Sequence, residues 1–231
     1  MCYTDEQDFC VILGADSSKW DKQCPLPFPS FFNEAIDKFS NAVSYLSREQ
    51  KKLSLEALRH SNSEAVGEFY IKHGKQSAYF RVTDWQKIKK ENLFAKKPNF
   101  SPRNPTAALT KKIFERDFYR CRYCGLRIIT SDVFSEYSRI VGTEIFSIER
   151  EENKRNGLTL GLRGVADHVE PHSLGGPTEM DNLVTSCYSC NFGKDEYQLH
   201  QLRIENPFSR QPRDDGWRGL TEFLPALRVV K

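Results

Sequence analysis

The chain has 231 residues, of which 39% are hydrophobic and 28% are charged, and its formal net charge is +3. This composition is typical of a folded globular protein and excludes disorder as the main state. No apolar run approaches the roughly 20 residues that span a bilayer, and the acidic start MCYTDEQDF lacks the basic and apolar regions of a secretion signal. We therefore expect a cytoplasmic protein with no membrane partner.

The first part of the chain predicts an α-rich N-terminal domain. Residues 1–28 show no periodicity, and we interpret their three cysteines as buried, inert thiols in irregular chain. Over residues 30–46 apolar side chains recur at three- and four-residue steps, which predicts an amphipathic helix. Ser47 offers an N-cap for a second helix, and residues 61–73 predict a third helix that ends at Gly74.

A basic connection separates this domain from the rest of the chain. The stretch AYFRVTDW predicts a short strand, and the lysines, prolines and asparagines after it predict a loop. From Gln86 to Arg127 there are seven Lys and five Arg against two Glu and one Asp, which gives a local net charge of +9. We place the domain boundary in this connection, with the N-terminal domain at 1–104 and a second domain at 105–231.

The sequence of the second domain predicts both helices and strands. A helix with Thr106 near its start runs into the motif CRYCG, and residues 131–160 predict a further helix and a charged loop. The stretches LRGVADHVEP and NLVTSC suit two strands joined by a glycine-containing loop, and CNFGKDEYQLHQLRI suits a helix. The C-terminal tail, with an amphipathic piece around Trp217, is expected to pack back on the core.

Four of the seven cysteines form two Cys-x-x-Cys pairs, Cys121 with Cys124 and Cys187 with Cys190. In each pair a tight turn aims two thiolates at one point, and four thiolates complete the tetrahedron that Zn²⁺ prefers. A redox function is the alternative for such a pair, but neither lies in a thioredoxin-like context. The pairs therefore predict a structural zinc site, and since protein fills all four positions, catalysis is expected elsewhere.

The motifs CRYCG, DHVEPHSLGG, DNLVTSC and CNFGK occur in this order and together resemble the HNH endonuclease family. The resemblance covers about residues 106–200. It implies a zinc-clamped ββα-metal (HNH) nuclease domain and says nothing about residues 1–100. With the α-rich domain predicted there from periodicity, we expect an α+β chain. The implied activity is metal-dependent hydrolysis of phosphodiester bonds in DNA, leaving 5′ phosphate and 3′ hydroxyl ends. Bacterial or phage restriction, antiviral defence or mobile-element biology is the implied setting.

Phosphodiester hydrolysis needs a base for water and a bound cation, and the polar residues of these motifs can supply both. His168 titrates near neutrality and can take a proton from water, whereas Asp167, its neighbour on a strand, points to the opposite face and can bind a hard cation. The resemblance makes His168 the general base and Asn182 the residue that fixes its loop. It makes Asp167 and Asn191 ligands of a catalytic Mg²⁺ or Mn²⁺. Lys194, one turn beyond Asn191, is predicted to steady the phosphate charge, with a solvated lysine as the alternative.

The basic connection is placed to hold nucleic acid through phosphate contacts, which carry no sequence information. For any single cation, a solvated surface position is the alternative. The predicted contacts are Lys96, Lys97, Arg103, Lys111, Lys112 and Arg116.

Two other interpretations stay open. One is a zinc-dependent module that binds nucleic acid without cutting it. The other is a nuclease that acts on RNA, or that serves as a subunit of a multi-protein defence system and is activated by a protein partner at the N-terminal domain.

Overall fold

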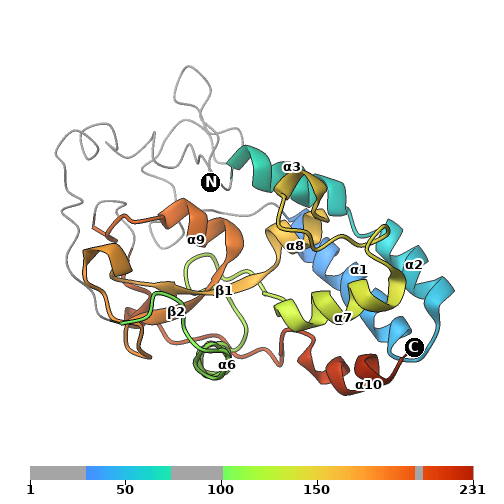
Figure 1. Ribbon diagram of the computed structural model, residues 1–231. Helices are drawn as coiled ribbons and strands as arrows, with labels where there is room; N and C mark the ends of the chain where they lie inside the picture. Colours follow the sequence, from blue (N-terminus) through green and yellow to red (C-terminus); the bar gives the residue numbers. More distant parts are fainter. Residues whose placement is uncertain (1–29, 74–100, 201–204, 231) are drawn as a thin grey trace.

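The computed structural model describes residues 30–73, 101–200 and 205–230 (Figure 1). Within these ranges no helix is long and apolar enough to cross a membrane. The following predictions lie outside the described residues: the irregular start with Cys2, Cys10 and Cys24, the strand AYFRVTDW, the helix end at Gly74, and the contacts of Lys96 and Lys97.

The described residues form helices and one small sheet. The helices are α1 (Phe31–Leu46), α2 (Lys51–Arg59), α3 (Ser63–His73), α6 (Ala107–Arg116), α7 (Ser131–Val141), α8 (Gly157–Gly161), α9 (Tyr188–Lys194) and α10 (Leu224–Val229). The strands are β1 (Gly164–His168) and β2 (Leu183–Cys187), which pair antiparallel. Short 3-10 turns are η2 (Glu152–Lys154), η3 (His172–Leu174), η4 (Pro207–Ser209) and η5 (Thr221–Phe223). The predicted α+β class is confirmed, with a helical first part and a ββα unit that we define as β1, β2 and α9.

Helix α1 forms where the apolar periodicity predicts it. Residues three and four positions apart share one side of a helix, and that side is buried in α1. The buried residues are Phe32, Ala35, Ile36, Phe39, Ala42, Val43 and Leu46. The N-cap predicted at Ser47 was wrong. Its hydroxyl donates to the Ser44 carbonyl (2.8 Å), and because Glu49 turns the chain with a positive φ of 62°, α2 begins only after Gln50.

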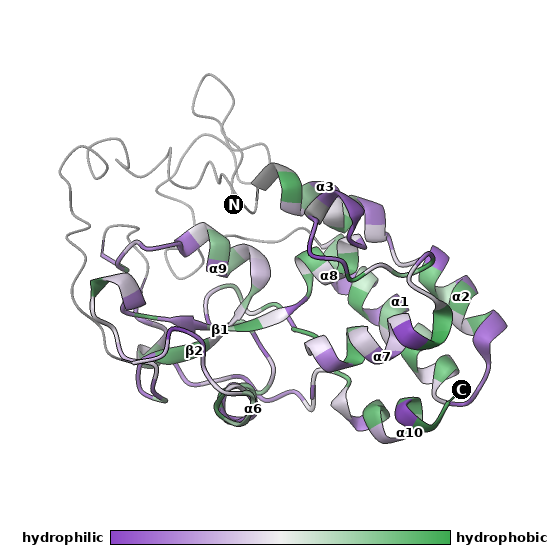
Figure 2. Cartoon of the chain, in the orientation of Figure 1, coloured by the Kyte–Doolittle hydropathy of each residue, from purple (hydrophilic) through white to green (hydrophobic). Residues whose placement is uncertain are grey.

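Helices from both predicted domains make one helical lobe, defined as α1, α2, α3, α7, α8 and α10 (Figure 1). The ring of Phe39 in α1 packs against Phe134, Tyr137 and Phe146, with centroids 5.0 to 5.4 Å apart. The hydroxyls of Ser54 and Tyr137 share a hydrogen bond of 2.9 Å. Figure 2 shows hydrophobic and hydrophilic residues alternating along α1, α2 and α7, as expected for helices with one buried face. Core contacts therefore cross the predicted domain boundary.

The ββα unit has short strands and a short helix. His168 on β1 lies opposite Leu183 on β2, and α9 follows β2 without a loop. The helix predicted over CNFGKDEYQLHQLRI is too long, because α9 ends at Lys194. The next residue, Asp195, has a positive φ of 49°, which a right-handed helix does not accommodate.

Helix α6 packs against the strands of the ββα unit. Thr106 lies at the start of the helix, as predicted. It is the N-cap, and its side chain accepts a hydrogen bond from the Leu109 amide (3.2 Å). Asp117, just past the helix, is fully buried. Its carboxylate accepts hydrogen bonds from the Thr185 amide in β2 (2.7 Å) and from Arg122 (3.2 Å). Asp117 thus ties the end of α6 to β2 and to the turn that carries the first cysteine pair.

The C-terminal tail packs back on the core, as predicted. The indole Nε1 of Trp217 donates to the carbonyl of Ile128 (2.8 Å), and Leu220 is buried. Arg139 of α7 donates to the carbonyls of Leu227 (2.9 Å) and Val230 (3.1 Å). The tail therefore contacts both the helical lobe and the cysteine-bearing region.

Candidate metal centre and active site

Four thiols meet where the turn after α6 approaches the junction of β2 and α9. Cys121 and Cys124 come from the turn, Cys187 ends β2, and Cys190 lies in the first turn of α9. Their sulfur atoms all lie within 4.8 Å of one another, and the sulfurs of Cys124 and Cys187 are 3.7 Å apart. Zn–S bonds of about 2.3 Å in a tetrahedron separate the sulfurs by about 3.8 Å. The four cysteines thus fit a structural zinc ion.

The thiols of this cluster also set one another's charge. Burial raises the pKa of Cys121, but hydrogen bonds from the other three cysteines hold that pKa well below its ordinary value. The hydrogen bond with Cys121 raises the pKa of Cys187, and burial raises that of Cys190 well above the usual range. The four thiols are thus electrostatically coupled, and a dication would favour their thiolate forms, because metal ligands must be deprotonated.

Asp167 is buried on β1, and only 6% of it is exposed. Its Oδ2 accepts a hydrogen bond from the Tyr123 hydroxyl (2.7 Å) and lies 3.5 Å from the ammonium of Lys194. Burial raises the pKa of Asp167, while the charge of Lys194 and the hydrogen bond from Tyr123 oppose that effect. The Oδ1 atom makes no hydrogen bond or ion pair with any described residue. One carboxylate oxygen is thus held by protein, and the other stays available.

Lys194 does not have the environment of a solvated lysine. Its side chain is 1% exposed, and its ammonium donates to the carbonyl of His168 (2.7 Å) as well as pairing with Asp167. The helical spacing from Asn191 therefore brings Lys194 to the site, but toward the end of β1. A contact between Lys194 and phosphate stays a prediction.

His168 follows Asp167 on β1 and has a different set of neighbours. Its Nε2 lies 2.9 Å from the hydroxyl oxygen of Thr178, and its ring meets the ring of His172 edge to face, with centroids 5.4 Å apart. Burial, aided by nearby cationic groups, lowers the pKa of His168 to about 4. The ring is therefore neutral at neutral pH and can accept a proton.

Asn182 holds both ends of the loop between the strands. Its Oδ1 accepts from the Glu170 amide (2.8 Å), and its Nδ2 donates to the carbonyls of Glu170 (3.0 Å) and Pro177 (2.9 Å). A Cβ at Gly176 would lie 2.0 Å from the Glu170 carbonyl oxygen, so only glycine allows the chain to approach so closely. The structure thus places Asn182 where it fixes the loop that follows His168.

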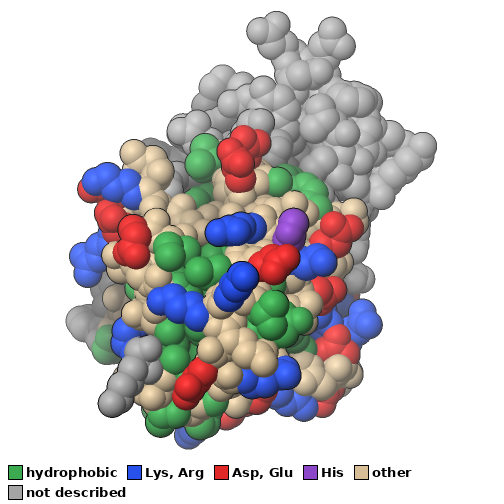
Figure 3. All heavy atoms as spheres, turned by 90° about the vertical axis from the view of Figure 1, so that its right-hand side faces the viewer, with side chains coloured by type: hydrophobic (Ala, Val, Ile, Leu, Met, Phe, Trp, Pro, Cys, Tyr) green, Lys and Arg blue, Asp and Glu red, His purple; other side chains and the backbone are tan. Residues whose placement is uncertain are grey.

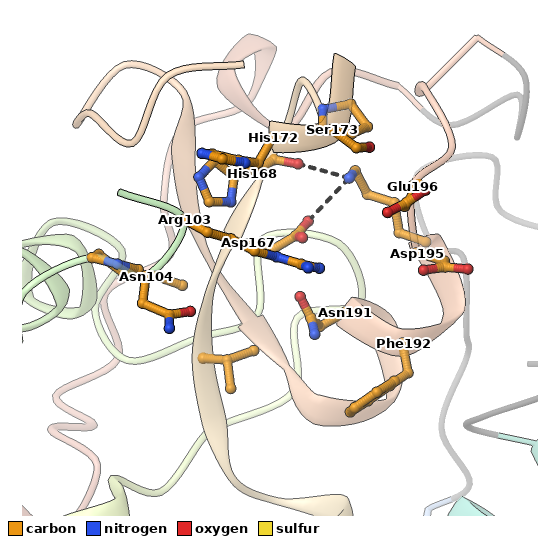
Figure 4. Close-up of a pocket in the computed structure, with 15 residues that line it drawn as sticks. Arg103, Asn104, Asp167, His168, His172, Ser173, Asn191, Phe192, Asp195 and Glu196 are labelled. Carbon is orange, nitrogen blue, oxygen red and sulfur yellow. Dashed lines mark hydrogen bonds and ion pairs between the residues drawn. The ribbon is translucent and has the colours of Figure 1, made fainter. Parts of the chain in front are cut away.

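One cavity of about 490 Å³ brings the predicted residues together (Figure 4). It is lined by Asp167, His168, Asn191 and Lys194, and also by Arg103 from the segment before α6. In Figure 4, Asn191 on α9 and Asp167 on β1 direct their side chains toward the same space. Arg103 is exposed, and its guanidinium has no hydrogen-bond or ion-pair partner among the described residues. The cavity thus combines oxygen ligands, a neutral imidazole and an available cation.

Comparison with known proteins agrees with this arrangement. The family model described as HNH endonuclease matches residues 163–196, which span both strands and α9. The ββα unit thus matches the HNH family model. This family indicates a nuclease that uses a divalent metal, and the resemblance seen in the motifs is confirmed over these residues. No curated protein and no solved structure matches the chain.

The predicted nucleic-acid contacts have different environments around the HNH domain. Lys111 and Lys112 are exposed on α6, and Lys111 lies 3.7 Å from Glu115. Arg116 instead donates to the carbonyls of Met180 (2.5 Å) and Leu183 (2.7 Å) and also pairs with the neighbouring Asp117. These bonds give Arg116 an internal, structural position. Contact of any of these cations with nucleic acid stays a prediction.

The opposite side of the molecule, formed by the helical lobe, has mixed charge. Figure 3 views the structure from the right-hand side of Figure 1, and on this face Lys and Arg side chains are interspersed with Asp and Glu. A polyanion is attracted by a surface whose charge is mainly positive. Among the described residues, Arg103 at the cavity is therefore a better placed cation than those on this face.

Two residues of the site were not predicted from the sequence. Tyr123 lies between the paired cysteines of CRYC and contacts Asp167, while Thr178 contacts His168 from the far side of the strand-joining loop. The only sequence signal for Tyr123 is its position inside the cysteine turn. Thr178 carries no such signal, because its contact depends on how the loop folds.

Proposed function

We propose that the chain is a metal-dependent endonuclease that hydrolyses phosphodiester bonds in DNA and leaves 5′ phosphate and 3′ hydroxyl ends. The observation that carries the proposal is the lining of one cavity by Asp167, His168 and Asn191. Together these side chains offer oxygen ligands for a cation and a base for water. A packing function alone does not require this combination beside an available guanidinium.

Asp167 and Asn191 are the residues that would hold the catalytic Mg²⁺ or Mn²⁺. Hard cations take oxygen ligands, and Mg²⁺ commonly keeps several waters while binding only one or two protein side chains. The available Oδ1 of Asp167 and the amide oxygen of Asn191 suit this demand. When bound, such an ion supplies a Lewis acid at the scissile phosphate and the leaving oxygen.

His168 would take the proton of the attacking water. Its pKa of about 4 keeps the ring neutral at the working pH, so a lone pair is available for the proton. Lys194 donates to the carbonyl of His168 and pairs with Asp167, so it holds both residues in place at the end of β1. Arg103 would contribute its positive charge to the phosphate at the cavity.

DNA is the substrate that we propose, and phosphate contacts would supply most of the affinity. The exposed lysines of α6, together with Arg103, offer charge without base specificity. Binding should therefore weaken as the salt concentration rises. A bacterial or phage setting in restriction, antiviral defence or mobile-element biology is supported by the family resemblance alone. The cytoplasmic location is proposed from the sequence composition.

A cleavage assay tests the proposed function directly. The zinc-loaded chain is incubated with DNA or RNA of the same sequence, in Mg²⁺ or Mn²⁺. Removal of the general base in His168→Ala should slow DNA cleavage by about 10²- to 10⁴-fold. The exposed His200 provides the matched control, and His200→Ala should cleave like the parent chain.

Four outcomes would contradict this proposal in different ways. Equal activity of the parent and His168→Ala would remove His168 as the base. Cleavage of RNA alone would replace the substrate. Binding of DNA without cleavage in either metal would favour the non-catalytic module, whereas cleavage that begins only when a second protein is added would favour the partner-activated subunit.

A further inference from the structure

The segment before α6 is attached to the loop that follows His168. Two hydrogen bonds make the attachment: His172 Nε2 donates to the carbonyl of Ser101 (2.9 Å), and the Thr178 hydroxyl donates to the carbonyl of Pro102 (2.6 Å). The same hydroxyl oxygen lies 2.9 Å from Nε2 of His168. Thr178 therefore connects a backbone carbonyl to the ring of His168.

The direction of these bonds follows from the number of protons available. A backbone carbonyl can only accept, so the one hydroxyl proton of Thr178 is used on Pro102. Toward His168 the hydroxyl oxygen can then only accept, which requires a proton on Nε2 of the imidazole. A neutral imidazole carries one ring proton. With that proton on Nε2, the basic lone pair is on Nδ1.

We propose that Thr178 is a positioning residue that fixes the tautomer of His168, with the proton on Nε2 and the base function on Nδ1. The assignment of the base function rests on the proposed nuclease activity, whereas the tautomer is a property of the folded chain. The carbonyl of Pro102 determines the direction in which the Thr178 hydroxyl points. The segment that carries Arg103 thus also orients the base.

The arrangement serves the ring both before and after it takes a proton. When Nδ1 accepts a proton from water, the ring becomes an imidazolium with protons on both nitrogens. Its Nε2–H still donates to the oxygen of Thr178, so no partner has to rotate during the transfer. Hydrogen bonding to a charged group is stronger than to a neutral one, so the bond favours the protonated product.

A purely structural function of Thr178 is the competing explanation, since the hydroxyl also ties the loop to Pro102. The two explanations differ in the state of the His168 ring. A loop tie predicts the same tautomer in the parent chain and in a variant without the hydroxyl, whereas a positioning residue predicts that the tautomer changes. The tautomer is therefore the decisive observable.

Long-range ¹H–¹⁵N NMR correlations of the imidazoles measure this tautomer. The spectra are recorded on the zinc-bound chain at pH 8, without Mg²⁺ or nucleic acid, and His168→Gln assigns the signals. In the parent chain and in Thr178→Ser, which keeps a hydroxyl, we expect the proton on Nε2. In Thr178→Val, which has similar volume and no hydroxyl, the tautomer with the proton on Nδ1 should become populated.

Single-turnover cleavage provides the second measurement. Loss of a hydrogen-bond partner that orients a metal-bound histidine typically costs 10- to 100-fold in activity, and we expect a comparable effect for the partner of a base. Thr178→Val should therefore lose at least about tenfold in rate, and Thr178→Ser should recover most of that loss.

The results distinguish a wrong tautomer assignment from a wrong assignment of the base function. A proton on Nδ1 in the parent chain overturns the tautomer assignment, and so does a proton that stays on Nε2 in Thr178→Val. If Thr178→Val fails to fold, the parent and Thr178→Ser spectra still test the assignment, because a proton on Nδ1 in either one overturns it. If the tautomer is as expected but His168→Ala cleaves normally, only the proposed base function fails.

Discussion

The described residues form two sites that suit metals, and these sites differ in how many ligands the chain supplies. At the first site four cysteines, three of them buried and Cys124 partly buried, approach one point, so protein would fill every position around a tetrahedral ion. At the second site Asp167 and Asn191 offer oxygens at the side of an open cavity. The difference teaches that a closed ligand set suits an ion that stabilises the fold, and an open set suits an ion that must also bind substrate.

The two sites are also joined through short stretches of chain. Tyr123 lies inside the first cysteine pair and donates to Asp167, and Cys190 is followed directly by Asn191. Both proposed ligands of the catalytic ion are thus positioned by residues of the cysteine cluster. Substitutions at adjacent positions can therefore test whether the two sites have the separate functions that their ligand sets indicate.

The largest effect is expected from Cys190→Ser. A structural zinc site contributes roughly 10 kcal/mol or more to folding, and the serine hydroxyl is a poor replacement for a thiolate. We expect the HNH domain to lose bound zinc and cooperative unfolding, as measured by metal content and by thermal melting. The parent chain treated with excess chelator should behave in the same way. If Cys190→Ser held no zinc and still melted like the zinc-bound parent, the four thiols would merely pack together.

The next largest effect is expected one residue further on, in Asn191→Ala. The side-chain amide of Asn191 makes no hydrogen bond with the described residues and faces the cavity, so its loss should change the melting temperature little. Cleavage should fall by about 10²-fold or more because one of two protein ligands is gone. Zinc content should equal that of the parent. If Asn191→Ala lost zinc as Cys190→Ser does, the two sites would not be separable.

A smaller effect is expected at the link between the sites, in Tyr123→Phe. The phenol has one hydrogen bond to lose, worth about 1 kcal/mol of stability, and its ring can stay buried. Partners of metal ligands typically affect metal affinity by 10- to 100-fold, so cleavage should need about tenfold more Mg²⁺ for its half-maximal rate. Zinc content provides the control. An unchanged Mg²⁺ requirement would show that Lys194 alone positions Asp167.

The sequence predicted the elements whose signals are local. The apolar stripe of α1, the Thr106 cap and the two strands each depend on neighbouring residues, and the structure contains them. The two cysteine pairs could be joined across 62 residues because four thiols have one common chemical use. The end of α9 was missed, because the conformation of Asp195 depends on contacts that sequence periodicity does not describe.

Residues that act through long-range contacts were harder to predict. Spacing put Lys194 near Asn191 but could not show that the ammonium is buried against Asp167. Thr178 reaches His168 only because the intervening loop folds back, and it reaches Pro102 across 76 residues of sequence. Such contacts depend on tertiary packing, which has no period in the sequence.

The last prediction concerns pH, and the change that we expect in the His168 ring above pH 5 is close to zero. Burial lowers the pKa of His168 to about 4, below the ordinary value of about 6.5. Because the folded state disfavours the proton, the ring should stay neutral between pH 8 and pH 5. The unfolded chain takes up this proton first as the pH falls, so the His168 contribution lowers stability progressively between about pH 6.5 and pH 4. An NMR titration of the assigned His168 ring should thus show almost no change above pH 5. A midpoint near 6.5 would mean that the cavity solvates the His168 ring as bulk water does. The catalytic site would then differ in solvation from the buried cysteine cluster even more than we infer.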